Sequence, residues 1–327
     1  MTLADDTMSR YPENDAITAI KLFDGHHCNI IGFKTNSDHK QWQASIKWRS
    51  NLNPWPPAID SQFLAASIVE SNRDFQPCRL LEVGCGSGYL TIISAHRWPC
   101  MKEVHLIDID VLAIAAAQVN IQQDSICRKL AIHTYWRGFE KFQGDGFDIV
   151  LCAPPYMPDR PWPDSRIEVA TNGTALLEQV VRRAGSMSKE TWMVFSVFAW
   201  PEFQRALAQV PNTYRLIEVT RREFVPFRIP WLEPRPPEED GNESDFLACR
   251  KYYENVLMKR GLIDLDEMNN WPKYLQDFAL SIPDNCSARL NVPRDTFDLE
   301  ATLDTIKKES RGYRFWHEVR VVRLVSE

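Results

Sequence analysis

Three glycines lie within five residues, directly after a short apolar run, in Leu80-Leu-Glu-Val-Gly84-Cys-Gly86-Ser-Gly88. The chain has only 13 glycines in 327 residues, so a scarce residue is concentrated at this point. The apolar run predicts a buried strand, and residues 88–97 predict a helix. A strand that passes through glycines into a helix lets a ligand approach the backbone at the helix N-terminus. The cluster therefore predicts an α/β fold with a ligand site at this turn.

The spacing of the glycines excludes the commonest ligand of such a turn. A dinucleotide fingerprint, Gly-x-Gly-x-x-Gly, needs glycine at the position where this chain has Tyr89. The second predicted strand, residues 103–108, ends in Asp108, where a carboxylate can accept hydrogen bonds from a ribose. Ile109, beside it, is placed to face an adenine ring. A nucleoside-containing ligand other than a dinucleotide fits this pattern.

This arrangement resembles that of the class I S-adenosylmethionine (SAM)-dependent methyltransferases, over residues 60–228 and the last predicted strand. The resemblance implies SAM as the cofactor, with its amino-acid end on the glycine loop, its ribose on the acidic residue and no metal. The residues that it assigns to cofactor binding are Glu82, Gly84, Cys85, Gly86, Gly88, Asp108 and Ile109. A glycine-rich turn in another doubly wound fold is the alternative.

A second motif, Ala153-Pro154-Pro155-Tyr156, follows the strand predicted at 147–152. It is similar to the Asn/Asp/Ser-Pro-Pro-Tyr motif of methyltransferases that modify adenine N6, cytosine N4 or a glutamine amide. In those enzymes two acceptors hold the N–H groups of the planar nitrogen, and the tyrosine stacks on the planar group. Residues 171–177 also resemble a segment of the glutamine N5-methyltransferases. The resemblance, closest to the "methyltransferase small" group, assigns Ala153, Pro154, Pro155 and Tyr156 to the catalytic site.

Two positions depart from that pattern. Ala153 has no side-chain acceptor, and the loss of one hydrogen bond in a desolvated site costs about 1–3 kcal/mol. Arg137 stands where such families usually place an aspartate that touches the adenine amine, and a guanidinium cannot accept that bond. The resemblance nevertheless implies methyl transfer to a nitrogen of a protein (glutamine amide-like) or of an RNA nucleobase. A small-molecule methyltransferase and a degenerate SAM-binding interaction module stay open as alternatives.

The alternation of strands and helices over residues 80–200 predicts a doubly wound, Rossmann-like sheet, and the resemblance implies seven strands with the last antiparallel. We expect an N-terminal extension (1–58), a SAM-binding core (59–228), a helical insertion (229–312) and a final strand that rejoins the sheet (313–327). A proline-rich acidic segment, residues 230–245, marks the start of the insertion. The insertion and the N-terminal extension are expected to flank the substrate opening.

Composition limits the cellular location and the kinds of partner that the chain can have. Apolar stretches such as Met193–Trp200 are far shorter than the roughly 20 residues of a membrane span, so no membrane partner is expected. The eight cysteines contain no Cys-x-x-Cys pair or zinc-finger spacing, which favours reduced thiols, a cytoplasmic location and no metal. The formal charge of -6 includes five acidic residues within 238–245, so the rest of the chain is almost neutral. The net charge therefore does not argue against an RNA substrate.

Overall fold

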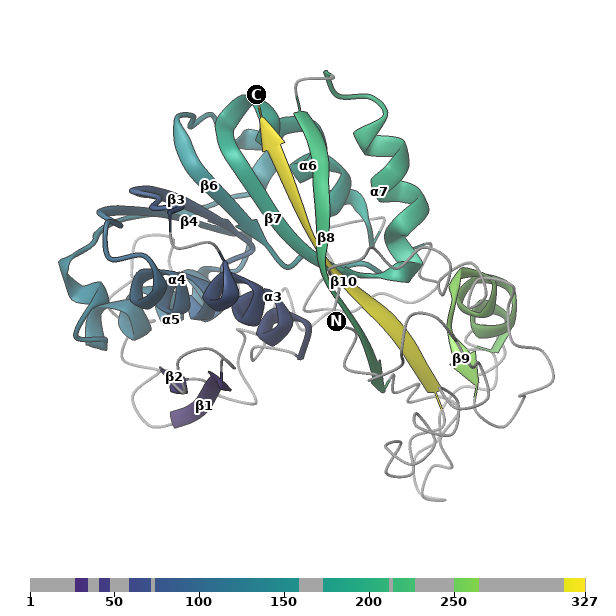
Figure 1. The fold of residues 1–327 in the computed structure, drawn as a ribbon, viewed down its shortest axis with the longest axis horizontal. Coiled ribbons are helices and arrows are strands. Elements are labelled where there is room, and N and C mark those ends of the chain that lie inside the picture. Colours follow the sequence, from purple (N-terminus) through teal and green to yellow (C-terminus); the bar gives the residue numbers. More distant parts are fainter. Residues whose placement is uncertain are drawn as a thin grey trace, which may run out of the picture.

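The computed structural model describes residues 27–34, 41–47, 59–71, 74–158, 173–211, 214–226, 250–264 and 315–326. One sheet contains eight described strands, seven of which lie in the order β5-β4-β3-β6-β7-β10-β8 (Figure 1). The strands are β3 (Arg79–Val83), β4 (Glu103–Asp108), β5 (Ala131–Trp136), β6 (Phe147–Cys152), β7 (Ser188–Ser196), β8 (Tyr214–Pro226) and β10 (Phe315–Ser326). Strand β10 is antiparallel to both of its neighbours, β7 and β8, whereas the other pairings within this group are parallel. The predicted doubly wound α/β sheet with an antiparallel last strand is confirmed.

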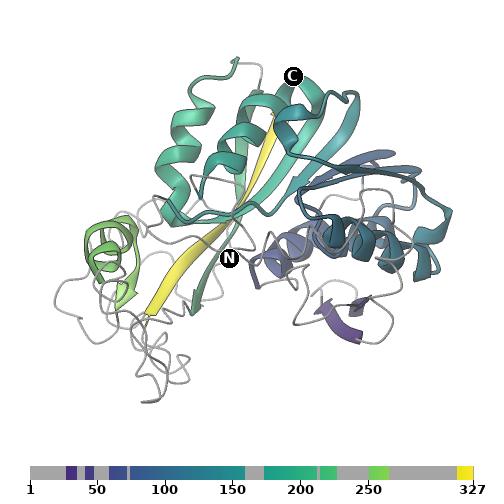
Figure 2. The ribbon, with the colours of Figure 1, turned by 180° about the vertical axis from the view of Figure 1, so that it is seen from behind.

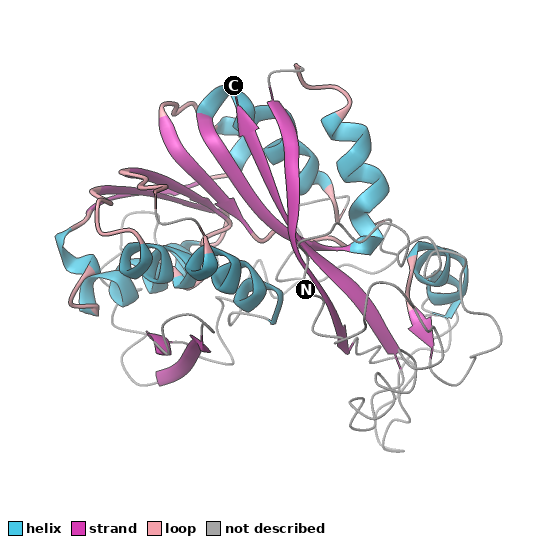
Figure 3. Cartoon of the chain, viewed as in Figure 1, coloured by secondary structure: helices cyan, strands magenta, loops and turns pink. Residues whose placement is uncertain are grey.

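Helices cover both faces of this sheet (Figures 2 and 3). One face carries α3 (Ile59–Glu70), α4 (Tyr89–Arg97) and α5 (Val111–Gln123), and the other carries α6 (Ala175–Met187) and α7 (Trp200–Leu207). Successive side chains of a strand point to opposite faces. Leu80 accordingly packs in the core that holds Ile92 of α4, and Leu81 in the core that holds Val181 of α6. Apolar strands with two buried faces thus explain the near-continuous hydrophobic runs of the sequence.

Two of these helices, α3 and α7, are not among the elements expected from the sequence. Residues 63–69 of α3 are all buried, so this helix lacks the polar face that produces an amphipathic period. Helix α7 is short and carries Pro201 in its first turn, where the missing N–H is tolerated. A helix that is apolar all round cannot be told from a buried strand by periodicity alone.

Smaller elements flank the core. β1 (His27–Lys34) and β2 (Gln41–Lys47) form an antiparallel pair that lies against α4 and α5. In the predicted insertion, residues 250–260 are helical and lead to β9 (Ile263–Asp264), which pairs with β10. Residues 1–26 of the predicted N-terminal extension and residues 265–312 of the predicted insertion lie outside the described residues. The boundaries at 58, 228 and 312 stay predictions. No helix within the described ranges is both long and apolar enough to cross a bilayer.

Gly88 is a position where the fold requires glycine. Its φ is +75°, and a Cβ there would lie 3.2 Å from Cα and Cβ of Ala117 and from Cδ1 of Ile121 on α5. Gly84 has a similar φ of +70°, but a Cβ there would meet only Leu176 Cδ2, at 3.9 Å. We therefore expect Gly84→Ala to lower the free energy of unfolding by about 1–2 kcal/mol, through backbone strain alone. Gly88→Ala should lower it by about 1–3 kcal/mol more, since it also forces α4 and α5 apart.

Urea unfolding of the two variants tests this difference, because both carry the same backbone strain and only one carries the packing clash. Equal losses for Gly84→Ala and Gly88→Ala would show that the close approach of α4 to α5 is not what fixes glycine at position 88.

Candidate functional site

Strand register brings the predicted site segments to one edge of the sheet. Val83 of β3 pairs with Ile107 of β4 on one side and with Cys152 of β6 on the other, and both pairings are parallel. The glycine loop follows β3, Asp108 ends β4, and Ala153 follows β6. The carboxyl ends of three neighbouring strands therefore present the two motifs side by side, where open α/β sheets bind their ligands.

The glycine loop is held by backbone hydrogen bonds. The N–H groups of Gly84 and Cys85 both donate to the Ile107 carbonyl, at 2.8 and 3.1 Å, and the Gly88 N–H donates to the Cys85 carbonyl at 2.8 Å. Gly84, Gly86 and Gly88 all have positive φ, between +49° and +75°. The Cys85 side chain is buried, and burial raises the pKa of its thiol well above the usual value. Cys85 is thus placed to offer a ligand its backbone and not its sulfur.

Asp108 braces this loop from the neighbouring strand. Its Oδ2 accepts a hydrogen bond from Gly86 N at 3.0 Å, and its Oδ1 accepts one from Asp110 N at 3.0 Å. Burial raises the pKa of Asp108 to about 6, although these two hydrogen bonds favour the charged form. Ile109 follows with 40% of its surface exposed, and its carbonyl accepts from Trp136 Nε1 at 2.8 Å. Asp108 and Ile109 thus lie at the carboxyl end of β4. A carboxylate suits the hydroxyl groups of a ribose, and an exposed apolar side chain suits the face of an adenine.

Glu82 lies beneath the loop and faces helix α4. Its Oε2 accepts hydrogen bonds from the backbone N–H of Thr91 at 3.0 Å and from the Thr91 hydroxyl at 2.5 Å. The side chain is 2% exposed, and burial raises the pKa of Glu82 to about 8. This carboxyl group joins the end of β3 to the first turn of α4. Its role as a contact for the SAM ammonium stays a prediction.

The residues at this edge fit SAM. Among the described side chains, no basic group pairs with Glu82 or Asp108, and the Asp108 charge is itself one of the causes that raise the pKa of Glu82. A ligand with a positive sulfonium and a positive ammonium would compensate that acidic charge. The predicted roles, with the amino-acid end of SAM on the glycine loop, its ribose at Asp108 and its adenine at Ile109, stay predictions. When bound, SAM supplies a methyl group activated on its sulfonium.

The raised pKa of Glu82 predicts that the free energy of unfolding falls as pH rises. The folded chain keeps a proton on Glu82 up to about pH 8, whereas the unfolded chain loses it near the ordinary glutamate pKa of 4.5. The folded state thus binds more protons between these values, so the free energy of unfolding should fall by up to about 1.4 kcal/mol per pH unit as pH rises through this window. Glu82→Gln should flatten that slope.

Urea unfolding at several pH values between about 7 and 8, without cofactor, measures this slope above the ranges in which Asp108 and His317 contribute their own pH dependence. Asp148→Asn is the matched control, because the pKa of Asp148 is lowered and its titration lies below the window. That variant loses the ion pair with Lys189 and leaves only an uncharged oxygen for the Cys78 and Arg79 amides, so it should be less stable at every pH in this range with an unchanged slope. A slope that survives in Glu82→Gln would assign the pH dependence to other groups.

The Ala153-Pro154-Pro155-Tyr156 motif begins directly after β6. Ala153 is half-buried and packs against the core beneath α3 and α4, Pro154 is buried, and Pro155 is half-buried. The half-buried Tyr156 ring packs against the core that holds α6 and against a smaller one that holds residues 252–262. Beyond it, Met157 bridges to Gly173, and the Pro158 carbonyl accepts from Tyr252 Oη at 2.5 Å. The turn is fixed at both ends, and position 153 brings no polar side chain to it.

Two residues near Tyr156 escape sequence reasoning. Burial and the charge of Asp60, in the first turn of α3, raise the pKa of the Tyr156 hydroxyl well above its usual value. His317 on β10 lies with its ring centroid 6.1 Å from that of Tyr156, and its Nδ1 is 2.7 Å from Ser196 Oγ. Burial lowers the pKa of His317 to about 3, so the imidazole is neutral. Neither residue belongs to a local motif, and only the folded sheet brings them to the turn.

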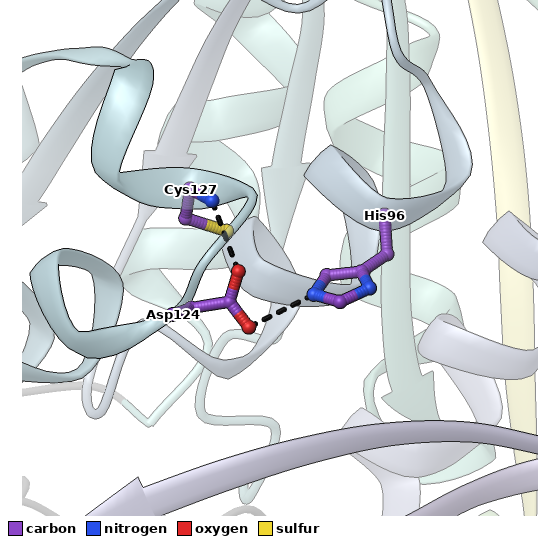
Figure 4. Close-up of side chains that lie close together, drawn as sticks. All are labelled: His96, Asp124 and Cys127. Carbon is purple, nitrogen blue, oxygen red and sulfur yellow. Dashed lines mark hydrogen bonds and ion pairs between the residues drawn. The ribbon is translucent and has the colours of Figure 1, made fainter.

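A second group of polar side chains lies away from this edge (Figure 4). Donor atoms of His96, Asp124 and Cys127 lie within 4.8 Å of one another. Asp124 Oδ1 accepts from the backbone N–H groups of Ile126 and Cys127, both at 2.9 Å, and its Oδ2 is 2.9 Å from His96 Nε2. The carboxylate thereby caps the helical turn that begins at Cys127. These bonds explain the cluster as a structural cap.

A comparison with protein families identifies the core. Residues 58–183 match the model of the methyltransferase small domain. Over these residues the chain is similar to that family. The matched residues contain both motifs and the strands β3 to β6 that hold them. The resemblance to class I SAM-dependent methyltransferases that the glycine loop and Asp108 indicate is confirmed.

Curated relatives match part of this methyltransferase small domain. A tRNA1(Val) (adenine(37)-N6)-methyltransferase of Pasteurella multocida is 28% identical over 83 residues, which are 24% of this chain and 34% of the relative. A ribosomal RNA large subunit methyltransferase G of Vibrio vulnificus is 30% identical over 77 residues, 24% of this chain and 20% of the relative. The chain thus spans about a third or less of these relatives. A solved dimethyladenosine transferase of Plasmodium falciparum is 13% identical, with a TM-score of 0.35, over 81% of this chain and 62% of that one.

Proposed function

We propose that this methyltransferase small domain transfers a methyl group from SAM to a nitrogen of an RNA nucleobase. The observation that carries the proposal is the shared edge at the ends of β3, β4 and β6, which holds the glycine loop, Asp108 and Tyr156. The relatives named for adenine N6 and ribosomal RNA methylation support the RNA acceptor. A cytoplasmic location is part of the proposal, because Cys78, Cys85, Cys100, Cys127 and Cys152 are free thiols.

In this reaction the chain acts mainly by positioning. The nitrogen–methyl bond forms as the methyl–sulfur bond breaks, S-adenosylhomocysteine leaves, and the new methylammonium loses its proton. The glycine loop and Asp108 orient the methyl donor at the edge of the sheet. Tyr156 stacks on the planar acceptor and aims its nitrogen at the methyl carbon. Holding the two reactants in this geometry replaces an encounter in solution with an oriented contact, which is where most of the rate enhancement arises.

Position 153 favours a nucleobase over a glutamine amide. With alanine there, only backbone carbonyls remain to accept the N–H groups of the acceptor nitrogen. An amide nitrogen has a strongly delocalised lone pair and depends most on such acceptors. An aromatic base offers a larger π-face to Tyr156, so stacking can supply more of its orientation. The acceptor that fits this turn is therefore one recognised by its ring and activated less by hydrogen bonds.

Restoring the missing acceptor should raise turnover on an exocyclic amine. Ala153→Asn places an amide oxygen where the related motif has one, and one hydrogen bond in a desolvated site is worth about 1–3 kcal/mol, or about 5- to 150-fold in rate. We expect a higher kcat with an unchanged Kd for SAM. Ala153→Ser, which brings a shorter acceptor, should give a smaller gain. Lower turnover in both variants would mean that position 153 does not face the acceptor nitrogen.

The acceptor class is tested with methyl-tritiated SAM and an extract from cells that lack this chain. The extract is divided into RNA, protein and small molecules, and each fraction is incubated with the purified chain. Label in RNA supports the proposal. Label in protein assigns a glutamine-like acceptor, and label in small molecules a metabolite. A chain that binds SAM but labels none of the three fractions is an interaction module, which contradicts the proposal.

A further inference from the structure

Three side chains with metal-ligating atoms share one face of the sheet, at the edge that β5 forms. Glu103 and His105 are two residues apart on β4 and therefore point to the same face, and His133 of β5 pairs directly with His105. Donor atoms of the three lie within 4.8 Å of one another. Glu103 begins β4 and Asp108 ends it, so at about 3.3 Å per residue the two lie about 17 Å apart. The group is therefore separate from the edge that holds the glycine loop.

This group has a buried base and an open side. The side chain of His105 is 9% exposed, that of Glu103 29% and that of His133 47%. The His105 ring stacks on that of His133, with centroids 4.5 Å apart, and on that of Tyr135, with centroids 5.7 Å apart. An ion can thus reach the donor atoms from solvent on the side of His133, while the stacked rings hold His105 in place.

The distances between the donor atoms are close to those of a zinc site. Zinc holds nitrogen and oxygen ligands at about 2.1 Å, which places two ligand atoms at tetrahedral angles about 3.4 Å apart. Glu103 Oε1 lies 3.6 Å from His133 Nε2 and 2.6 Å from His105 Nε2. The first distance already suits zinc, and the second has to lengthen by about 0.8 Å. Arg79 donates from Nε to the other oxygen, Oε2, at 3.2 Å and from Nη2 to Oε1 at 3.4 Å, and so fixes the carboxylate beside the histidines.

The protonation states of these groups also suit a cation. The hydrogen bond from His105, together with Arg79, lowers the pKa of the Glu103 carboxyl, which is therefore charged at neutral pH. Burial lowers the pKa of His105, so its imidazole is neutral and one ring nitrogen carries a lone pair. His105 Nδ1 lies 3.0 Å from Tyr135 Oη, and a phenol oxygen can accept as well as donate. The ring can therefore keep its proton on Nδ1, against Tyr135, and turn a bare Nε2 toward an ion, as metal-bound histidines do.

We propose that Glu103, His105 and His133 bind a zinc ion that joins β4 to β5. Two imidazole nitrogens and one carboxylate oxygen are a ligand set that zinc accepts, whereas magnesium and calcium take oxygen ligands. Three protein ligands leave the fourth tetrahedral position to water. No local spacing marks this site in the sequence, because strand pairing brings His133 to the other two residues. The expectation of no metal, which rests on cysteine and zinc-finger spacing, does not extend to it.

Isothermal titration of zinc chloride into the purified, untagged chain tests the inference. The parent should bind a single zinc ion at this site, and magnesium chloride should not compete for it. Loss of an outer partner of a metal ligand costs about 10- to 100-fold in affinity, so Tyr135→Phe should weaken zinc binding by about 10-fold. His133→Ala and Glu103→Gln, which remove a ligand or its charge, should weaken it by about 100-fold or more.

His96→Ala is the matched control, because it removes a histidine that also pairs with a carboxylate, that of Asp124, in the other group of donor atoms. It should leave the Kd for zinc unchanged. Zinc should also raise the urea midpoint of the parent and of His96→Ala but not that of His133→Ala, whose half-exposed side chain can be removed without unfolding the chain. A parent that binds no zinc, a His133→Ala variant with the parent's Kd, or a loss of zinc binding in His96→Ala would each overturn the inference. None of these measurements needs a methyl acceptor, so they stand apart from the test of the proposed function.

Discussion

Asp108→Ala is expected to weaken SAM binding by about 100-fold or more. The ribose of SAM would lose a carboxylate acceptor, and one or two hydrogen bonds to a charged group are worth about 1.5–3 kcal/mol each, where 1.4 kcal/mol is tenfold in Kd. The change also removes the 3.0 Å hydrogen bond from Gly86 N to Asp108 Oδ2, which holds the glycine loop in place. Isothermal titration of SAM into the parent and the variant measures the effect directly.

The neighbouring acid Asp110 offers a matched control. Its Oδ1 accepts from Leu112 N at 2.9 Å and caps α5, so Asp110→Ala should lower stability by about 1 kcal/mol through loss of the cap. It should leave the Kd for SAM within about 3-fold, because the loss of the cap acts on α5 and not on the ribose position. Equal losses of affinity in the two variants would mean that the acidic charge of this edge, and not the position of Asp108, determines binding.

Tyr156→Ala is expected to lower kcat by about 100-fold or more, with the Kd for SAM nearly unchanged. The change removes the ring that stacks on the planar acceptor, and misplacement of a reactant by about 1 Å can cost about 100-fold in rate. Single-turnover methyl transfer to RNA, measured at saturating SAM, separates this loss from any change in cofactor binding.

Tyr156→Phe serves as the graded control, since it keeps the ring and removes only the hydroxyl. It should fall between the parent and Tyr156→Ala. A variant Tyr156→Ala that keeps its kcat, or one that loses SAM binding in the same proportion, would show that this side chain is not the platform for the acceptor.

The glycine loop and Asp108 could be predicted from the sequence because local physics determines them. Glycines at positive φ after a buried strand indicate a turn that only glycine adopts readily, and the next strand ends in the acid. Parallel neighbouring strands then bring Val83 and Ile107 into register, so the two features meet without any further information. The same rule brings the Ala-Pro-Pro-Tyr turn after β6 to this edge.

The residues that surround Tyr156 could not be predicted in this way. Asp60 is an ordinary acid at the start of a helix, and α3 itself carries no amphipathic period because residues 63–69 are all buried. His317 lies on β10, whose position between β7 and β8 depends on the whole sheet. Long-range pairing of this kind leaves no local pattern in the sequence.

For Glu82, the sequence predicts that the residue belongs to the site, but it does not predict the hydrogen bonds that the side chain accepts from Thr91. An acid two residues before the glycine loop suggests a partner for the SAM ammonium. The hydrogen bonds from the Thr91 amide and hydroxyl to one of its oxygens, which join it to α4, have no signal in the sequence. Sequence spacing determines which residue follows the strand, but the rotamer depends on which unsatisfied amide of the next helix lies nearest.

The most direct test of methyl transfer to a nucleobase is mass spectrometry of nucleosides after the reaction. RNA from cells that lack this chain is incubated with the purified chain and methyl-deuterated SAM, digested, and compared with the same RNA treated with Asp108→Ala. The account predicts a deuterated methyl group on a nitrogen of one base, absent with the variant. Deuterium on a ribose or a ring carbon, or in no nucleoside although SAM binds, would contradict it.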